Sequence, residues 1–218
     1  MISKIFSGAV IGLDAEPIEV EADVTNGLPA TIVVGLPDTA VQESRERVKT
    51  AIKNSGSSYP QTRVSVNLAP ADVPKLGTHF DLPIALAILS ASEQVAFDPK
   101  GKIFLGELSL DGALRPVPGV LAVAMKAKSF GVKELFVPKA NAKEAALVNG
   151  LKIYPVDDLR QLLAHLLGIK TIEPEIAVLP EEILKNFQAS LDMKDVAGQE
   201  LAKRALEIAA AGGHNILI

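Results

Sequence analysis

Residues 75–81 bring together side chains that could do hydrolytic chemistry. Thr78, His79 and Asp81 supply a hydroxyl, an imidazole and a carboxylate within one short stretch. These are the groups of a nucleophile, its general base and the acid that orients the base. Side chains so close in sequence rarely point at one another productively, however, and a carboxylate at a helix start commonly serves as the N-cap. The pattern favours a structural role, with Asp81 capping the following helix and His79 in a surface loop, and we expect no catalytic residue.

The composition limits the other chemistry that the chain can perform. It has no cysteine, which excludes thiolate ligands, disulfides and a cysteine nucleophile. The three histidines lie far apart in sequence, which argues against a zinc site. The first residues lack an apolar stretch followed by a cleavage site, and the longest apolar run, residues 82–89, is too short to span a bilayer. These features predict a cytoplasmic protein without membrane contact.

Basic side chains offer one further kind of chemistry, which is contact with a phosphate backbone. The net charge is −4, so a basic surface would have to be local. Lysines cluster between residues 116 and 150 and could combine with two cations from the middle of the chain; the candidates are Arg63, Lys75, Lys126 and Lys128. Aromatic residues make up 4% of the chain, so base stacking is not expected. The alternative is that these are solvated lysines on helix faces.

Hydrophobic periodicity predicts the elements that must position these groups. Strands are expected at residues 4–11 and 16–24, joined by a turn, with another at 30–34, which predicts an antiparallel opening sheet. Thr39 is expected to cap the next helix, on whose exposed face Glu43 and Arg47 have the spacing of a solvated ion pair. A strand at 63–68 leads to a helix from about Asp81 that is apolar on nearly every side and is the best candidate for a central buried helix.

The second half of the chain alternates helix and strand. Asp111-Gly112 predicts a hairpin between residues 103–110 and 113–117. We then expect a helix at 118–130, a strand at 134–137, a helix at 140–148, a strand at 151–156 and a helix at 157–167. This order predicts one compact domain of mixed α and β structure. The following residues contain Pro174 and Pro180, lack a sustained period and are interpreted as a linker.

The last segment has the pattern of the opening of a nucleotide-binding domain. Asp195 precedes Val196-Ala197-Gly198-Gln199, and a helix and Gly212-Gly213 lead to an expected strand at Asn215–Ile218. A phosphate-binding loop normally begins after such a strand. We therefore expect the groups that hold phosphates to lie beyond Ile218.

Three segments together resemble a known family. They are Lys75-Leu-Gly-Thr-His-Phe-Asp-Leu-Pro-Ile-Ala, Gly106-Glu-Leu-Ser-Leu-Asp-Gly-Ala-Leu-Arg-Pro-Val-Pro-Gly and Val196-Ala-Gly-Gln-Glu-Leu-Ala-Lys-Arg-Ala-Leu-Glu-Ile-Ala-Ala-Ala-Gly-Gly-His-Asn. They closely resemble the magnesium-chelatase-like AAA+ ATPases of the YifB/ComM family. The resemblance implies an α/β (α+β) fold in which residues 1–167 form a Lon-protease-like domain of the ribosomal protein S5 domain 2-like type. Residues 168–190 would be a linker and residues 191–218 the incomplete start of an AAA+ ATPase domain.

The resemblance to Lon proteases suggests a peptidase, but the residues at the positions of the catalytic dyad argue against that function. Lon uses a Ser-Lys dyad, and placing Pro74-Lys75-Leu76-Gly77 on its loop puts His79 at the serine position. The position of the lysine base falls on Leu121, which cannot accept a proton. Thr78 would then keep an unactivated hydroxyl. The resemblance therefore implies a domain without proteolytic activity.

The resemblance also implies a nucleotide site in a longer protein. In AAA+ proteins the matching segment lies over the adenine, so Val196, Gly198 and Gln199 would line that end of an ATP site. Binding energy for ATP comes mainly from the phosphate loop and from the groups that place magnesium. We expect ATP and Mg as cofactors of the full-length parent and none for this chain alone.

The function implied is one tier of a hexameric ring that couples ATP hydrolysis to movement on DNA, as in branch migration during recombination or transformation. This domain would assemble the ring and guide DNA. The alternative is an oligomerisation or partner-docking module of a chelatase-like or chaperone-like ATPase without DNA contact. Salt-dependent DNA binding separates these two hypotheses.

Overall fold

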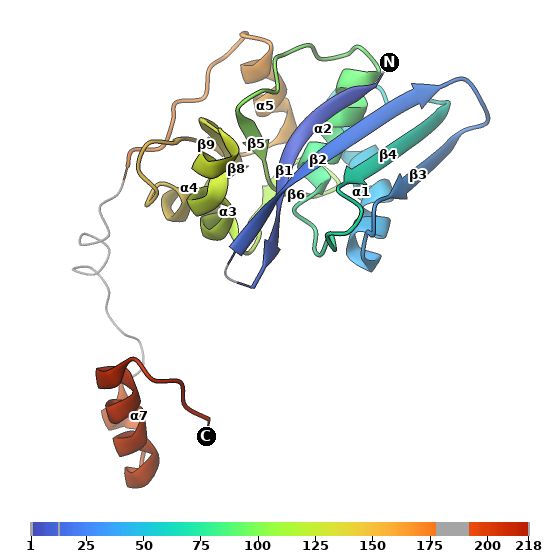
Figure 1. The fold of residues 1–218 in the computed structure, drawn as a ribbon. Helices are drawn as coiled ribbons and strands as arrows, with labels where there is room; N and C mark the ends of the chain where they lie inside the picture. The colour runs from blue at the N-terminus through green and yellow to red at the C-terminus, as the bar shows by residue number, and fades with distance from the viewer. Residues whose placement is uncertain (1, 13, 178–191, 218) are drawn as a thin grey trace. The chain divides into compact units, whose positions relative to one another are not determined.

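The structure, a computed structural model, describes residues 2–12, 14–177 and 192–217. It divides into two units, residues 1–178 and 179–218, and each is described by itself. The first unit holds two main sheets with helices (Figure 1). Among the described helices, none combines the length and apolar character that a transmembrane span needs.

The first sheet has the strand order β1-β2-β4-β3, formed by β1 (Ser3–Ile11), β2 (Asp14–Thr25), β4 (Arg63–Ala69) and β3 (Ala30–Val34). β1 and β2 are antiparallel, as predicted, and β2 continues antiparallel to β4. The prediction was wrong for β3, which pairs parallel to β4. The reason is the helix between β3 and β4, because a crossover helix returns the chain in the same direction.

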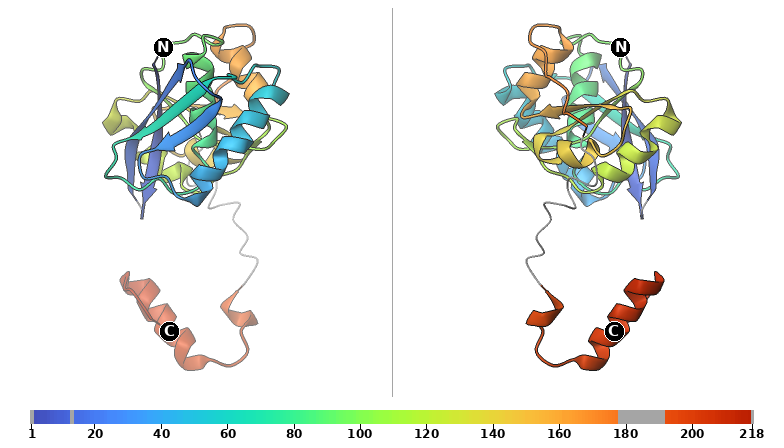
Figure 2. Two further views of the ribbon diagram at one scale, coloured as in Figure 1. Left: turned by 90° about the vertical axis from the view of Figure 1, so that its right-hand side faces the viewer. Right: turned by 90° about the vertical axis from the view of Figure 1, so that its left-hand side faces the viewer.

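Two helices cover the inner face of this sheet, α1 (Thr39–Asn54) and α2 (Asp81–Ala91) (Figure 1). Apart from Ser90, every residue of α2 is buried, which confirms the predicted central helix. Its side chains share one core with the sheet on one side and with Phe104, Phe136 and Leu159 on the other. Figure 2 shows α2 in the interior of the domain in both views.

The second sheet is parallel, with the order β5-β8-β9: β5 (Lys102–Phe104), β8 (Glu134–Pro138) and β9 (Lys152–Val156). The helices α3 (Val120–Ala127), α4 (Lys139–Ala145) and α5 (Leu159–Leu166) and the 3-10 turn η1 (Lys128–Phe130) accompany it. Phe104, Phe136 and Tyr154 occupy neighbouring register positions and stack with ring centroids 4.8 and 4.7 Å apart.

The predicted hairpin is much shorter than expected. Only β6 (Glu107–Leu108) and β7 (Leu114–Arg115) pair around Asp111-Gly112. Residues 103–105 are all buried and belong instead to β5 and its extension beside β8. A continuous apolar run suits a strand that is buried on both faces, as in a parallel sheet.

Residues 168–177, which follow α5, contact other parts of the first unit. Ile172 is buried, and its N–H group donates to Nδ1 of His165 at 2.9 Å. The Glu175 N–H group donates to the carbonyl of Ile153 at 2.7 Å. Residues 178–190 of the predicted linker, and Leu191, lie outside the described residues.

The second unit contains η2 (Met193–Asp195) and α7 (Glu200–Gly212). Asp192 caps η2 by accepting from the Lys194 N–H group at 3.1 Å. The strand predicted at Asn215–Ile218 is not formed in residues 215–217, and Ile218 lies outside the described residues. A strand needs a neighbour to satisfy its backbone groups.

Candidate functional site

The carboxylate of Asp81 is the centre of a buried polar cluster at the start of α2. Its side chain is fully buried, and it accepts from Arg47 Nε at 2.9 Å, Arg47 Nη2 at 3.1 Å and the Leu108 N–H group at 3.2 Å. The helix begins at Asp81 itself, with Phe80 in the capping position and no side-chain cap. The prediction of Asp81 as the N-cap was wrong, because its partners come from α1 and β6, which are distant in sequence.

Arg47 was predicted to pair with Glu43 in solvent, and this too was wrong. Its guanidinium group turns inward to Asp81 and also donates to the Ala40 carbonyl at 3.1 Å. Burial raises the pKa of Asp81 to about 6, against the opposing effect of the hydrogen bonds from Arg47. The hydrogen bond to Asp81 raises the pKa of Arg47. Both groups are therefore charged at pH 7. The cap of α1 is Asp38 rather than the predicted Thr39.

His79 is buried, which corrects its predicted place in a surface loop. Only 6% of the residue is exposed, and Nε2 lies 3.0 Å from the Gly8 carbonyl oxygen. Because a carbonyl only accepts, Nε2 carries the proton in the neutral ring. Burial lowers the pKa of His79 to about 4. The imidazole therefore fastens the loop before α2 to β1 instead of serving as a base.

Thr78 has a partner that the sequence did not reveal. Its hydroxyl donates to Glu107 Oε2 at 2.5 Å, and Arg115 Nη1 lies 3.8 Å from the other oxygen of that carboxylate. A carboxylate is a far weaker base than the alkoxide it would have to generate, so this contact positions Thr78 without activating it. Leu121 lies half-buried on α3. No group described at these positions combines a nucleophile with a suitable base.

Lys75 cannot join a DNA-binding surface in this conformation, contrary to the prediction. It is fully buried, and Nζ donates to the carbonyl of Pro70 in the same loop. Burial also lowers the pKa of this ammonium group. The side chain closes its own loop, an arrangement that charge counting along the sequence does not reveal.

The remaining predicted cations do not form one cluster. Arg63 pairs with Thr25 at the end of β2, whereas Lys126 forms an ion pair of 2.9 Å with Asp14 at the start of β2. A strand rises about 3.3 Å per residue, so the two ends of β2 are roughly 35 Å apart. Lys128 is exposed in η1, which follows the same helix as Lys126. Two other cations, Arg45 and Lys49, which the sequence reasoning had not selected, lie close together on α1.

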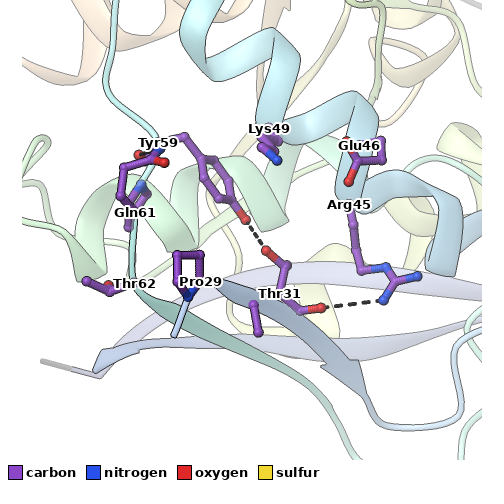
Figure 3. Close-up of a pocket in the computed structure, with 10 residues that line it drawn as sticks. Pro29, Thr31, Arg45, Glu46, Lys49, Tyr59, Gln61 and Thr62 are labelled. Atoms are coloured by element: carbon purple, nitrogen blue, oxygen red, sulfur yellow. Dashed lines mark hydrogen bonds between the residues drawn. The ribbon is translucent and has the colours of Figure 1, made fainter. Parts of the chain in front are cut away.

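Those cations line a polar cleft between α1, β3 and residues 59–62, here called the α1 cleft (Figure 3). Its volume is about 430 Å³. Arg45 and Lys49 lie one helical turn apart on α1 and share a face of the helix. Thr62 lines the cleft, whereas Arg63, the next residue, borders a different hollow together with Ile32 and Val34. Glu46 is the one acid among the lining residues.

Hydrogen bonds hold the α1 cleft in shape. Tyr59 and Thr31 join their hydroxyls at 2.7 Å, and Arg45 Nη1 donates to the Thr31 carbonyl at 3.4 Å (Figure 3). Among the described residues, Lys49 has no hydrogen-bond or ion-pair partner for its ammonium group. Guanidinium, ammonium, hydroxyl and amide groups are the donors that proteins direct at phosphate oxygens. The α1 cleft is the candidate nucleic-acid interface.

The residues predicted to contact adenine lie together at the start of α7. Val196 is 43% exposed, Gly198 has a φ of 68°, and Gln199 occupies the capping position of α7 with a φ of 59°. All three are exposed within the second unit. Their contact with nucleotide stays a prediction.

Comparisons with known proteins cover both units. The family model for subunit ChlI of Mg-chelatase matches residues 20–141, and a second model, magnesium chelatase subunit ChlI, matches residues 192–218. YifB of Escherichia coli is 44% identical over 219 residues, and competence protein ComM of Haemophilus influenzae is 42% identical over 219 residues. These alignments cover 100% and 99% of this chain, but only 42% and 43% of those proteins.

The comparisons also support the fold. Lon protease of Rhizobium meliloti is 28% identical over 156 residues, which cover 66% of this chain and 18% of that protein. The mixed α/β architecture with several sheets agrees with the predicted Lon-like domain. The chain belongs to the magnesium-chelatase-like family that includes YifB and ComM.

Proposed function

We propose that this chain is the non-proteolytic, DNA-contacting part of an ATP-driven DNA-translocating machine, in which it also serves ring assembly. The observation that carries DNA contact is the α1 cleft, where Arg45 and Lys49 lie among hydroxyl and amide donors. A role in DNA uptake or recombination is supported by the name of the relative ComM, a competence protein. The chain spans about 42% of the length of its curated relatives, so the activity of the whole protein is part of the proposal.

The cluster around α2 supports the absence of peptidase chemistry. The imidazole of His79 is committed to the Gly8 carbonyl, and the Thr78 hydroxyl to Glu107. The groups that could serve as base or nucleophile therefore already have structural partners. Hydrogen bonds of the same cluster tie the loop before α2 to β1 and β6.

ATP and Mg belong to the proposal for the longer protein. Val196, Gly198 and Gln199 are exposed and lie close in sequence, so they are free to face an adenine. Phosphate-binding groups supply most of the affinity for nucleotides. We expect this chain alone to bind ATP weakly, which an ATP titration by calorimetry would test.

The DNA proposal is tested by removing the cations of the α1 cleft. The variant Arg45→Gln/Lys49→Gln removes two positive charges there, and the control Lys126→Gln/Lys128→Gln removes two charges elsewhere. Affinity for a fluorescent duplex is measured by anisotropy at low salt. We expect the cleft variant to lose at least about tenfold in affinity and the control to change about threefold or less. Equal losses in the two variants would refute a localised interface.

A second candidate function is an oligomerisation or partner-docking module without DNA contact. The net charge of −4 favours it, because the overall field repels a polyanion. Under this alternative neither variant changes anything, since the wild type does not bind DNA at low salt.

A further inference from the structure

An apolar surface follows the edge strand β3. Ile32 and Val34 lie two residues apart on the outer face of the first sheet, where 37% and 48% of each residue is exposed. Leu36 and Leu76 come next, each 59% exposed, and the Lys75 N–H group donates to the Leu36 carbonyl at 3.2 Å. These four residues, Ile32, Val34, Leu36 and Leu76, are called the β3 patch. Apolar side chains gathered on a surface in this way are typical of a docking site.

The backbone displays Leu36 at an energetic cost. Its φ is 54°, a left-handed conformation that costs a leucine about 1–2 kcal/mol. Gly35 before it has a φ of 102°, and a Cβ atom there would lie 2.1 Å from the Leu68 carbonyl oxygen. The chain is thus bent tightly against β4, and the bend leaves a large apolar side chain in solvent. Strain of this kind is typical of functional segments.

The opposite edge of the same sheet carries an apolar groove. Phe6 on β1 and Pro17 on β2 form one wall, and Ile103, Phe130 and Val132 form the other, around a volume of about 310 Å³. This is called the β1 groove. The strand order β1-β2-β4-β3 places it at one edge of the sheet and the β3 patch at the other.

The two surfaces carry opposite charges. Glu21 and Asp23 border the same hollow as Ile32 and Val34, and Asp72 lies in the loop that leads to Leu76. Two bases oppose these acids: Arg63 lines the hollow, and Lys4 pairs with Glu21 at 3.0 Å. At the β1 groove, Lys102 pairs with Glu134 at 3.3 Å. Lys100 lines the groove, and Lys133 follows the lining residue Val132. Both lysines are exposed, and their ammonium groups have no partner among the described residues. An acidic apolar patch therefore faces away from a basic apolar groove.

We propose that the β3 patch of one copy docks in the β1 groove of a second copy. This deepens the proposed role in ring assembly, on which it rests, by naming the two surfaces. Different surfaces at opposite edges make a head-to-tail contact, which generates a ring if the rotation closes. The contact uses side chains rather than strand pairing, because Gln42 and Arg45 already donate to the Val33 and Thr31 carbonyls at the free edge of β3.

The apolar part of the contact is tested with exposed leucines. Sedimentation velocity of the 218-residue chain over a range of concentrations gives the self-association constant. We expect Leu36→Gln/Leu76→Gln to weaken association by about tenfold or more, since a few buried apolar residues carry most interface energy. The control Leu110→Gln/Leu167→Gln changes two exposed leucines off the patch and should leave it unchanged. A wild type that stays monomeric, or a control as weakened as the patch variant, would overturn the proposal.

The direction of the contact is tested by exchanging charges. Asp23→Lys/Asp72→Lys and Lys100→Glu/Lys133→Glu should each weaken self-association, because each places like charges at the contact. Mixing the two variants restores complementary pairs, and association should return toward the wild-type value. No recovery on mixing would contradict head-to-tail docking. The duplex affinity of the Leu36→Gln/Leu76→Gln variant is measured in parallel, so that failure of DNA binding and failure of self-docking are distinguished.

Discussion

The burial of His79 predicts a pH dependence of stability. Folding lowers the pKa of this imidazole from 6.5 to about 4. Above pH 6.5 the ring is neutral in both states, and its full contribution to stability is present. Between pH 6.5 and pH 4 the unfolded chain binds a proton that the native ring does not bind. The free energy of unfolding therefore falls as the pH falls through this window.

The size of the effect follows from the two pKa values. A difference of about 2.5 corresponds to about 3 kcal/mol at 25 °C. Asp81 acts in the opposite sense, because burial raises its pKa to about 6 and its protonation favours the native state as the pH falls. Between pH 4 and pH 6, His79 and Asp81 change the free energy of unfolding in opposite directions. Their effects largely cancel in the wild type, whose free energy of unfolding therefore changes little on their account. The comparison of wild type with His79→Gln isolates the imidazole.

The assay is urea unfolding from pH 4 to pH 7, followed by circular dichroism because the chain has no tryptophan. The free energy of unfolding of the wild type, minus that of His79→Gln, should rise by about 3 kcal/mol between pH 4 and pH 7. The difference between wild type and Asp81→Asn should change in the opposite direction. His214→Gln, at an exposed histidine, should stay within about 0.5 kcal/mol of wild type throughout. A pH-independent difference for His79→Gln would refute the reasoning.

Three further predictions concern the same region. Arg47→Met should lower the free energy of unfolding by about 3–5 kcal/mol, because it leaves the buried Asp81 carboxylate without its charged partner. Adding Asp81→Leu should recover most of that loss in the same urea assay. Gly35→Ala should destabilise by more than about 1 kcal/mol, since its Cβ meets the Leu68 carbonyl, and a thermal midpoint equal to that of wild type would argue against the tight bend. Lys75→Met should change stability by less than about 1 kcal/mol and leave duplex affinity unaltered, because the ammonium group is buried in its own loop; a marked loss of DNA binding would return Lys75 to the interface.

Local patterns predicted the elements well but not their long-range partners. The apolar run of α2 identified the central helix, because a helix without a polar face has to be buried. The parallel pairing of β3 and the departure of β5 from the hairpin depend on contacts between distant segments. Asp81 shows the same limit, since its position suggested a cap while its partners lie on α1 and β6.

The candidate site was predicted only in part. Arg63 was predicted to contact DNA but borders a different hollow, and Arg45 and Lys49, which line the α1 cleft, were not among the predicted residues. Their spacing of four residues was the available signal, and the sequence could not show that Tyr59 and Thr31 would close a cleft beside them. The prediction that Lys75 contacts DNA rested on its charge, which the sequence shows, whereas its burial is known only from the structure.

The salt dependence of DNA affinity tests the central claim most directly. Anisotropy titrations of the 218-residue chain with a duplex, over a series of salt concentrations, give the slope of log affinity against log salt. Two phosphate contacts from Arg45 and Lys49 predict a slope of about −2, which should approach zero in the cleft variant. No binding at low salt, or an affinity that does not depend on salt, would contradict the account.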